Sequence, residues 1–289
     1  MPFGCSGGLN TYPQTMLKFS ANLSLLFNEV PLLERIRLAR EQQFNGVEIQ
    51  FPYSVPAREL HAELKKTALP LVLFNVWADD LLQGGEGLAC VPNKQAAFKK
   101  AVALAYDYAE ILHPECINIL PGRCINTALH AEYWHTFLHN LDYAAQQFAP
   151  LGIKTVFEGL NTLDMPGALI HRGEQMLTVF NTVNNPHIFL QYDCYHAQKM
   201  HEDPCAFIRC HAHKIGHIQI ADCPGRGQPG TGSLDFRALF AAIEQSTYTG
   251  WIGAEYNPVG STHESLAWYR YWRSIGSPKM TYEQSSIDT

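Results

Sequence analysis

The sequence predicts an α/β protein whose core is a single (β/α)8 barrel, also called a TIM barrel. Two observations lead to this fold class. Eight short runs rich in β-branched or aromatic residues alternate along the chain with longer segments of helical periodicity. The chain has 289 residues, and barrels of this kind occupy roughly 250. A doubly wound open sheet shows the same alternation of strands and helices and is the alternative fold.

The predicted strands are short and start at residue 17. They cover residues 17–21, 47–51, 69–75, 116–120, 155–158, 188–192, 217–220 and 251–255. Each is separated from the next by a segment long enough for a crossover helix, which parallel strands require. If the barrel closes, the carboxyl ends of all the strands meet at one face, where catalytic side chains are expected.

Helical patterns fill the segments between these runs. Pro31 lies where a proline is tolerated in the first turn of a helix. Asp235 is placed to cap a helix, and Ser261 with Glu264 forms the pattern of a capping box. Three apolar faces have helical spacing: Leu32, Leu33, Ile36 and Ala39; Phe98, Val102, Ala105 and Ala109; and Phe137, Leu141, Ala144 and Phe148.

One domain is expected, spanning residues 16–273, between a flexible tail at 1–15 and a polar tail at 274–289. Residues 1–15 are rich in Gly, Pro and Ser and contain neither a basic residue nor an apolar stretch, so they do not resemble a secretory signal. The longest apolar run, 68–78, is interrupted by Pro70 and Asn75 and is shorter than the roughly 20 residues that span a bilayer. We therefore expect no membrane association.

Charge and cysteine usage point to a small-molecule partner. The chain carries 21 basic and 27 acidic residues, a net charge of −6, without a basic cluster that would neutralise nucleic-acid phosphates. Its eight cysteines include no CxxC pair, which indicates reduced thiols and a cytoplasmic protein. The group Cys205, Cys210, His211 and His213 matches no standard zinc spacing, so we do not expect a metal there.

The last four predicted strands each finish in a polar residue: Glu158, Asp193, Gln219 and Glu255. In a closed barrel these positions converge, and three carboxylates in a small space repel one another unless a cation is present. Oxygen ligands suit Mg²⁺ or Mn²⁺ better than zinc or copper. Taken alone, each residue can also be read as a solvated rim residue, a turn residue or a core amide, so only their convergence predicts a metal site.

The segment 225–232, GRGQPGTG, follows the seventh strand and formally matches the GxGxxG nucleotide motif. A phosphate site needs backbone N–H groups that open directly into a helix, but Pro229 lacks an N–H and the helix cap comes only at Asp235. A loop over the barrel mouth, with Arg226 as a clamp for a carboxylate, explains this segment better. An exposed arginine without a ligand is the alternative.

Several runs of the sequence resemble the hydroxypyruvate isomerase family, which includes the 2-oxotetronate isomerases and belongs to the xylose-isomerase-like TIM barrels. These runs are FSANLSLLF, GVEIQFPY, GLACVP, IFLQYDCYHAQKM, KIGHIQIADCPGRGQPGTG and GWIGAEYNP. The resemblance extends over residues 16–273. It implies a metal site formed by four residues: Glu158, Asp193, Gln219 and Glu255. It also implies that Glu158 and Glu255 act as the acid/base pair and that His196 and Arg226 contact the substrate.

The reaction that this resemblance implies is the interconversion of hydroxypyruvate and tartronate semialdehyde through a cis-enediolate, with Mg²⁺ or Mn²⁺ as cofactor. The substrate is then a keto acid or sugar acid, and the protein is a possible homo-oligomer. Four alternatives remain: a 2-oxotetronate isomerase, a neutral-sugar isomerase or epimerase, an endonuclease-IV-like nuclease, and a sugar-acid binding protein without catalysis. The net charge of −6 disfavours the nuclease.

The chain departs from the usual pattern of these relatives at several places. Relatives usually carry Pro-Ala-Gly-Asp, Pro-Gly-Arg, a Glu and a Lys where this chain has Val76–Asp79, Pro92–Lys94, Ser233 and Asn257, respectively. None of these positions is a predicted ligand. We expect them to line the pocket and therefore to bear on the choice of substrate.

Overall fold

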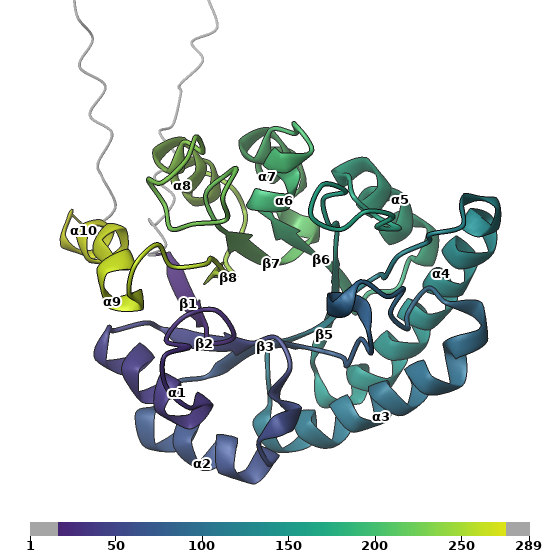
Figure 1. Ribbon diagram of the computed structural model, residues 1–289, viewed down its shortest axis with the longest axis horizontal. Coiled ribbons are helices and arrows are strands. Elements are labelled where there is room, and N and C mark those ends of the chain that lie inside the picture. The colour runs from purple at the N-terminus through teal and green to yellow at the C-terminus, as the bar shows by residue number, and fades with distance from the viewer. Residues whose placement is uncertain (1–16, 276–289) are drawn as a thin grey trace, which may run out of the picture.

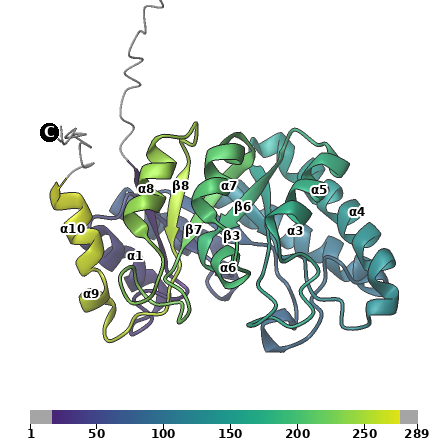
Figure 2. The same ribbon diagram turned by 90° about the horizontal axis from the view of Figure 1, so that it is seen from above.

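The computed structural model describes residues 17–275, and within this range eight parallel strands close into a barrel in chain order. Figure 1 shows the strands in the centre with the helices around them, and Figure 2 shows the helices alongside the strands. The pairing of β1 with β8 closes the sheet, which excludes the doubly wound alternative. No helix in the described range is long and apolar enough to cross a membrane.

The strands lie where the sequence predicts them. They are β1 (Lys18–Asn22), β2 (Gly46–Ile49), β3 (Leu71–Asn75), β4 (Cys116–Ile119), β5 (Lys154–Glu158), β6 (Ile188–Asp193), β7 (Ile215–Ile220) and β8 (Trp251–Ala254). Each predicted boundary is within two residues of the observed one. Glu158 and Asp193 are the last residues of their strands, and Glu255 directly follows β8.

The helices pack on the outer face of the barrel. They are α1 (Leu32–Glu41), α2 (Ala57–Thr67), α3 (Gln95–Leu112), α4 (His130–Phe148), α5 (Gly173–Val183), α6 (Cys194–Lys199), α7 (Pro204–His211), α8 (Phe236–Glu244), α9 (Thr262–Ser265) and α10 (Ala267–Ile275). Both predicted caps are confirmed: Asp235 accepts from the Ala238 backbone N at 2.9 Å, and Ser261 with Glu264 forms a capping box. The predicted faces of α3 and α4 are buried.

The predicted domain limits are only partly covered by the described residues. The tail at 1–15 and most of the tail at 274–289 lie outside them. Helix α10 runs to Ile275, two residues past the predicted end of the barrel at Arg273.

The interior of the barrel is unusually polar. Besides Thr155, Glu158 and Asp193, eight further polar or charged side chains on its strands are at most 6% exposed: Ser20, Asn22, Glu48, Asn75, Asn118, Gln191, His217 and Gln219. Buried polar groups persist only when they are hydrogen-bonded, and these are largely bonded to one another across the barrel. The network lies among the predicted site residues at the strand ends and fixes their positions.

Candidate active site

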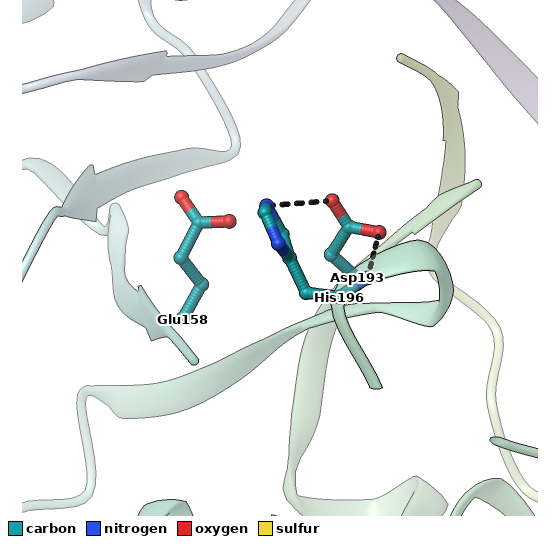
Figure 3. A group of neighbouring side chains, drawn as sticks. All are labelled: Glu158, Asp193 and His196. Atoms are coloured by element: carbon teal, nitrogen blue, oxygen red, sulfur yellow. Dashed lines mark hydrogen bonds and ion pairs between the residues drawn. The ribbon is translucent and has the colours of Figure 1, made fainter. Parts of the chain in front are cut away.

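Three predicted site residues meet where β5 and β6 end. One potential ligand atom from each of Glu158, Asp193 and His196 lies within 4.8 Å of the other two. All three side chains are buried, and Figure 3 shows the imidazole between the two carboxylates. Glu158 and Asp193 come from neighbouring strands, and His196 comes from the first turn of α6. In the described part of the chain this is the one such group of His, Cys, Asp and Glu, so no group forms at Cys205, Cys210, His211 and His213.

Asp193 offers one free carboxylate oxygen. Its Oδ1 caps α6 by accepting from the Tyr195 backbone N at 2.8 Å, whereas its buried Oδ2 has no hydrogen-bond partner. His196 Nε2 lies 3.5 Å and Arg226 Nη2 3.8 Å from Oδ2. Burial raises the pKa of Asp193, and the charge of Arg226 opposes that rise. A buried, unpartnered carboxylate oxygen is suited to a cation.

Glu158 is held by a single amide. Its Oε1 accepts from Asn118 Nδ2 at 2.7 Å. Burial raises the pKa of Glu158 well above its usual value, and the negative charges of Glu255 and Asp193 raise it further. This carboxyl group therefore either holds a proton or has its charge neutralised by a cation, and both states suit an acid/base residue next to a metal.

His196 presents an N–H rather than a lone pair to the site. Its Nδ1 accepts from the Asn161 backbone N–H at 3.2 Å and from Asn161 Nδ2 at 2.7 Å. Burial lowers the pKa of His196 well below its usual value, so the ring is neutral and its proton is on Nε2. A protonated Nε2 cannot bind a metal but can donate to a substrate oxygen. The chemistry of this residue thus fits the predicted substrate contact better than a role as ligand.

Arg226 and Glu255 form a partly buried ion pair. Arg226 Nη2 lies 2.7 Å from Glu255 Oε2, and Glu255 Oε1 accepts from Asn22 and Gln50, both at 2.9 Å. Burial raises the pKa of Glu255, while Arg226 lowers it. Arg226 Nε is buried and has no hydrogen-bond partner. The arginine predicted to clamp a substrate carboxylate is therefore bound, through Nη2, to a carboxylate of the protein.

Gln219 belongs to a network that sequence reasoning missed. Its Nε2 donates to Glu48 Oε1 at 2.8 Å, and its Oε1 accepts from Gln191 Nε2 at 2.7 Å. Glu48, which is fully buried on β2, also accepts from Ser20 and from His217 Nε2, both at 2.8 Å. The sequence carries one signal for it: a glutamate flanked by Val and Ile inside a predicted strand.

The structure therefore brings the four predicted ligands together only in part. Glu158 and Asp193 share one cluster, whereas Glu255 lies outside it and is paired with Arg226. The Gln219 amide nitrogen is fixed on Glu48, so only its oxygen, which already accepts from Gln191, can act as a ligand. Because a carboxylate only accepts hydrogen bonds, Glu48 determines the orientation of this amide.

A pocket of about 290 Å³ opens onto these residues. It is lined by Gln50, Phe51, Asn75, Leu81, Leu82, Gly84, Leu120, Arg123, Glu158, Leu160, Asp164, Met165, His196, Arg226 and Glu255. The lining combines apolar side chains with carboxylates and other polar groups, as is usual for a small-molecule site. A larger hollow of about 480 Å³ lies between α4 and α5 on the outside of the barrel and contains none of the predicted site residues.

The glycine-rich loop is organised by a buried aspartate. Asp222 accepts from the backbone N–H groups of Gly230 and Gly232 at 2.8 Å, and from that of Leu234 at 3.0 Å. Because these N–H groups point at a carboxylate of the protein, they are not available to a phosphate. This agrees with the prediction of a loop at the barrel mouth instead of a nucleotide site.

The expectation that the divergent positions line the pocket is wrong. None of Val76–Asp79, Pro92–Lys94, Ser233 and Asn257 is among the lining residues. Lys94 instead pairs with Asp79 at 3.0 Å, which joins two of the divergent segments. Trp77 is 44% exposed, and its ring lies edge-to-face with that of Phe51, which does line the pocket.

Comparison with known proteins identifies the family. Residues 36–272 match the model of the xylose isomerase-like TIM barrel family. The chain belongs to this family. It is 38% identical over 258 residues to hydroxypyruvate isomerase of Escherichia coli (strain K12), covering 89% of this chain and all of that protein. It is 36% identical to 2-oxo-tetronate isomerase of Pectobacterium atrosepticum, covering 89% of this chain and 98% of that one. These relatives confirm the predicted enzyme class, an isomerase.

Solved structures agree on the fold. A protein of Brucella melitensis described as an AP endonuclease of family 2 has a TM-score of 0.85 and 39% identity, covering 89% of this chain and 99% of that one. The 3-keto-D-glucoside 4-epimerase of E. coli has a TM-score of 0.74 at 21% identity over 89% of this chain and 99% of that one, a likeness of fold alone. The predicted xylose-isomerase-like barrel is confirmed.

Proposed function

We propose that the protein is a metal-dependent isomerase of a short keto acid, which interconverts hydroxypyruvate and tartronate semialdehyde (2-hydroxy-3-oxopropanoate). The observation that carries this proposal is the buried group of Glu158, Asp193 and His196, of which Glu158 and His196 line the pocket. The similarity to named hydroxypyruvate and 2-oxo-tetronate isomerases supports the substrate class. Conversion of the four-carbon 2-oxotetronate is the second candidate, favoured by 36% identity to an isomerase of that name.

Four oxygen-bearing residues are proposed as the metal ligands: Glu158, Asp193, Gln219 and Glu255. The free Oδ2 of Asp193 and the raised pKa of Glu158 both fit a hard divalent cation, Mg²⁺ or Mn²⁺. When bound, this cation supplies Lewis-acid polarisation of the carbonyl and hydroxyl oxygens of the substrate. It also offsets the repulsion among the carboxylates, which Arg226 alone balances only in part.

The reaction moves one proton between neighbouring carbons and another between their oxygens. One of Glu158 and Glu255 takes the proton from C3 of hydroxypyruvate, which gives the cis-enediolate, and a proton is returned at C2. The other glutamate carries out the proton transfer at the neighbouring carbon, C2. General acid/base catalysis of this type contributes on the order of 10² to 10⁴ in rate for each group.

Two nitrogen donors remain to orient the substrate. Nε2–H of His196 and the guanidinium of Arg226 each donate to a substrate oxygen. Both donors are held before substrate arrives, His196 by Asn161 and Arg226 by Glu255. Such fixed donors stabilise negative charge that develops on the enediolate oxygens.

The test is the substitution of Glu158→Gln and Glu255→Gln, assayed with hydroxypyruvate and 2-oxotetronate in Mg²⁺ or Mn²⁺. We expect kcat to fall at least a hundredfold in each variant. Turnover close to wild type in either one would refute the acid/base assignment. Turnover of neutral ketoses that is faster than that of the keto acids would indicate a sugar isomerase or epimerase. Cleavage of abasic DNA would indicate a nuclease. Tight binding of the keto acid without exchange of its protons with solvent would indicate a binding protein.

A further inference from the structure

We propose that Arg123 forms a carboxylate-binding subsite in the pocket and selects anionic over neutral substrates. Arg123 lies on the loop after β4 and lines the same pocket as Glu158, His196 and Glu255. The inference deepens the proposed function, because it rests on the substrate being a keto acid. It assigns the carboxylate of that acid to a residue that neither the sequence motifs nor the strand ends indicated.

Two backbone carbonyls hold the guanidinium of Arg123 in place. Its Nε donates to the carbonyl of Pro166 at 2.6 Å, and its Nη1 donates to the carbonyl of Gly84 at 2.5 Å. These carbonyls belong to the loops after β5 and β3, so the side chain is fixed from both neighbouring loops. Its Nη2 takes part in no hydrogen bond within residues 17–275 and remains available to a ligand.

Arg123 also keeps its full positive charge. Within the described part of the chain its partners are carbonyl oxygens, and no ion pair joins it to a carboxylate. Arg226, the other arginine in the pocket wall, is paired with Glu255 at 2.7 Å and lies 3.8 Å from Asp193. A carboxylate that enters the pocket is therefore attracted most strongly by Arg123, since the charge of Arg226 is already balanced.

Repulsion by the protein orients the substrate in the same sense. Glu158 and Glu255 line the pocket, Asp193 lies beside Glu158, and these carboxylates disfavour a second carboxylate near them. With its carboxylate on Arg123, a keto acid directs its reacting carbons toward the two glutamates. A neutral ketose has no group for this guanidinium, so binding to Arg123 separates keto acids from neutral sugars.

The experiment compares hydroxypyruvate with dihydroxyacetone, which has a hydroxymethyl group in place of the carboxylate. In Arg123→Gln, we expect KM for hydroxypyruvate to rise roughly ten- to a hundredfold, because charge-assisted hydrogen bonds are lost, with kcat changed less than threefold. Calorimetric binding of dihydroxyacetone to the Mn²⁺-loaded protein is expected to stay unchanged. Arg58→Gln, an exposed arginine on α2, is the matched control and should leave both values unchanged.

A second measurement uses the unaltered protein, because Arg123→Gln also removes two loop contacts and can reduce folding. Phenylglyoxal modifies accessible arginines, and mass spectrometry locates the product. Hydroxypyruvate is expected to protect Arg123 from modification, and dihydroxyacetone is not. Loss of hydroxypyruvate binding in Arg123→Gln supports the carboxylate subsite, whether or not the wild type is an active isomerase. If the wild type turns over no keto acid, the proposed function is refuted, but the subsite is not. An unchanged KM in a folded variant, or no protection, overturns the inference.

Discussion

Glu48→Gln is expected to destabilise the protein more than any other single change from carboxylate to amide on the barrel strands. Four donors converge on this carboxylate: Asn22 and Gln219 on Oε1, and Ser20 and His217 on Oε2. In the variant, the amide N–H₂ can face only one pair. Beside Asn22 and Gln219 it would meet two further N–H₂ groups, so it must turn toward Ser20 and His217.

The magnitude follows from the bonds that this turn removes. Both bonds to Oε2 are charge-assisted, and each is worth roughly 1.5–3 kcal/mol. Rotation of the Ser20 hydroxyl recovers part of one bond, which leaves a net cost of about 3–5 kcal/mol, the range for breaking a buried pair on one side. In a domain of this size that corresponds to a fall in Tm of roughly 6–20 °C.

Urea unfolding followed by tryptophan fluorescence at pH 7 measures this cost, and a thermal scan checks it. Glu41→Gln is the control, because Glu41 is exposed in the last turn of α1 and the loss of its charge there is expected to change stability by less than about 0.5 kcal/mol. If Glu48→Gln unfolds within 1 kcal/mol of wild type, the view of Glu48 as the centre of the interior network is wrong.

Three further predictions concern the metal, the space around Glu48 and pH. Asp193→Asn should weaken Mn²⁺ binding, measured by calorimetry, at least roughly tenfold, because it replaces the free oxygen Oδ2. The control Asp107→Asn, at an exposed position, should leave the affinity for Mn²⁺ unchanged. If Asp193→Asn and wild type bind Mn²⁺ equally well, Asp193 is not a ligand. Gly253→Ala should cost about 1–3 kcal/mol in urea unfolding, because its Cβ would collide with the Glu48 carboxylate; a neutral result would mean that the carboxylate can move aside. Burial raises the pKa of Asp164, but hydrogen bonds from Tyr195, Asn161 and Lys199 outweigh burial and lower the pKa overall. The ionised carboxylate therefore stabilises the fold at pH values above its ordinary pKa of 3.8, and this stabilisation is lost as the pH falls through the lowered pKa. Because Asp164 is 39% exposed, this contribution to stability is below about 1 kcal/mol. In acid titrations, the difference in stability between wild type and Asp164→Asn should vanish once the pH is below the lowered pKa of Asp164. A difference that stays constant with pH would contradict the stabilising role of the Asp164 carboxylate.

The sequence located the barrel and, at the strand ends, residues that the structure brings close together. Periodicity placed every strand within two residues, because strand ends in a barrel coincide with a change from apolar to polar residues. Glu158 and Asp193 were found for this reason, since each is the last residue of its strand. The pairing of Glu255 with Arg226 was not found, because it depends on the path of a loop that Asp222 fixes through backbone contacts.

Residues inside the barrel were harder to predict. Asn22, Glu48 and Asn118 lie within strands, where a polar side chain reads as an isolated exception to an apolar run. Their partners lie 26 to 233 residues away in the chain, so no local pattern indicates that they contact one another. Arg123 is a similar case, since its carbonyl partners are 39 and 43 residues distant.

The attachment of the 225–232 loop to Asp222 has a kinetic consequence. A loop that already has its backbone N–H groups satisfied by an internal carboxylate pays little conformational entropy when ligand arrives. Arg226, held by the same loop and paired with Glu255, is thus in place before ligand arrives, so the proposed reaction would not need a lid to fold over the substrate. Catalysis by this protein should accordingly be insensitive to solvent viscosity at saturating substrate, unlike that of barrels whose rate is set by loop closure.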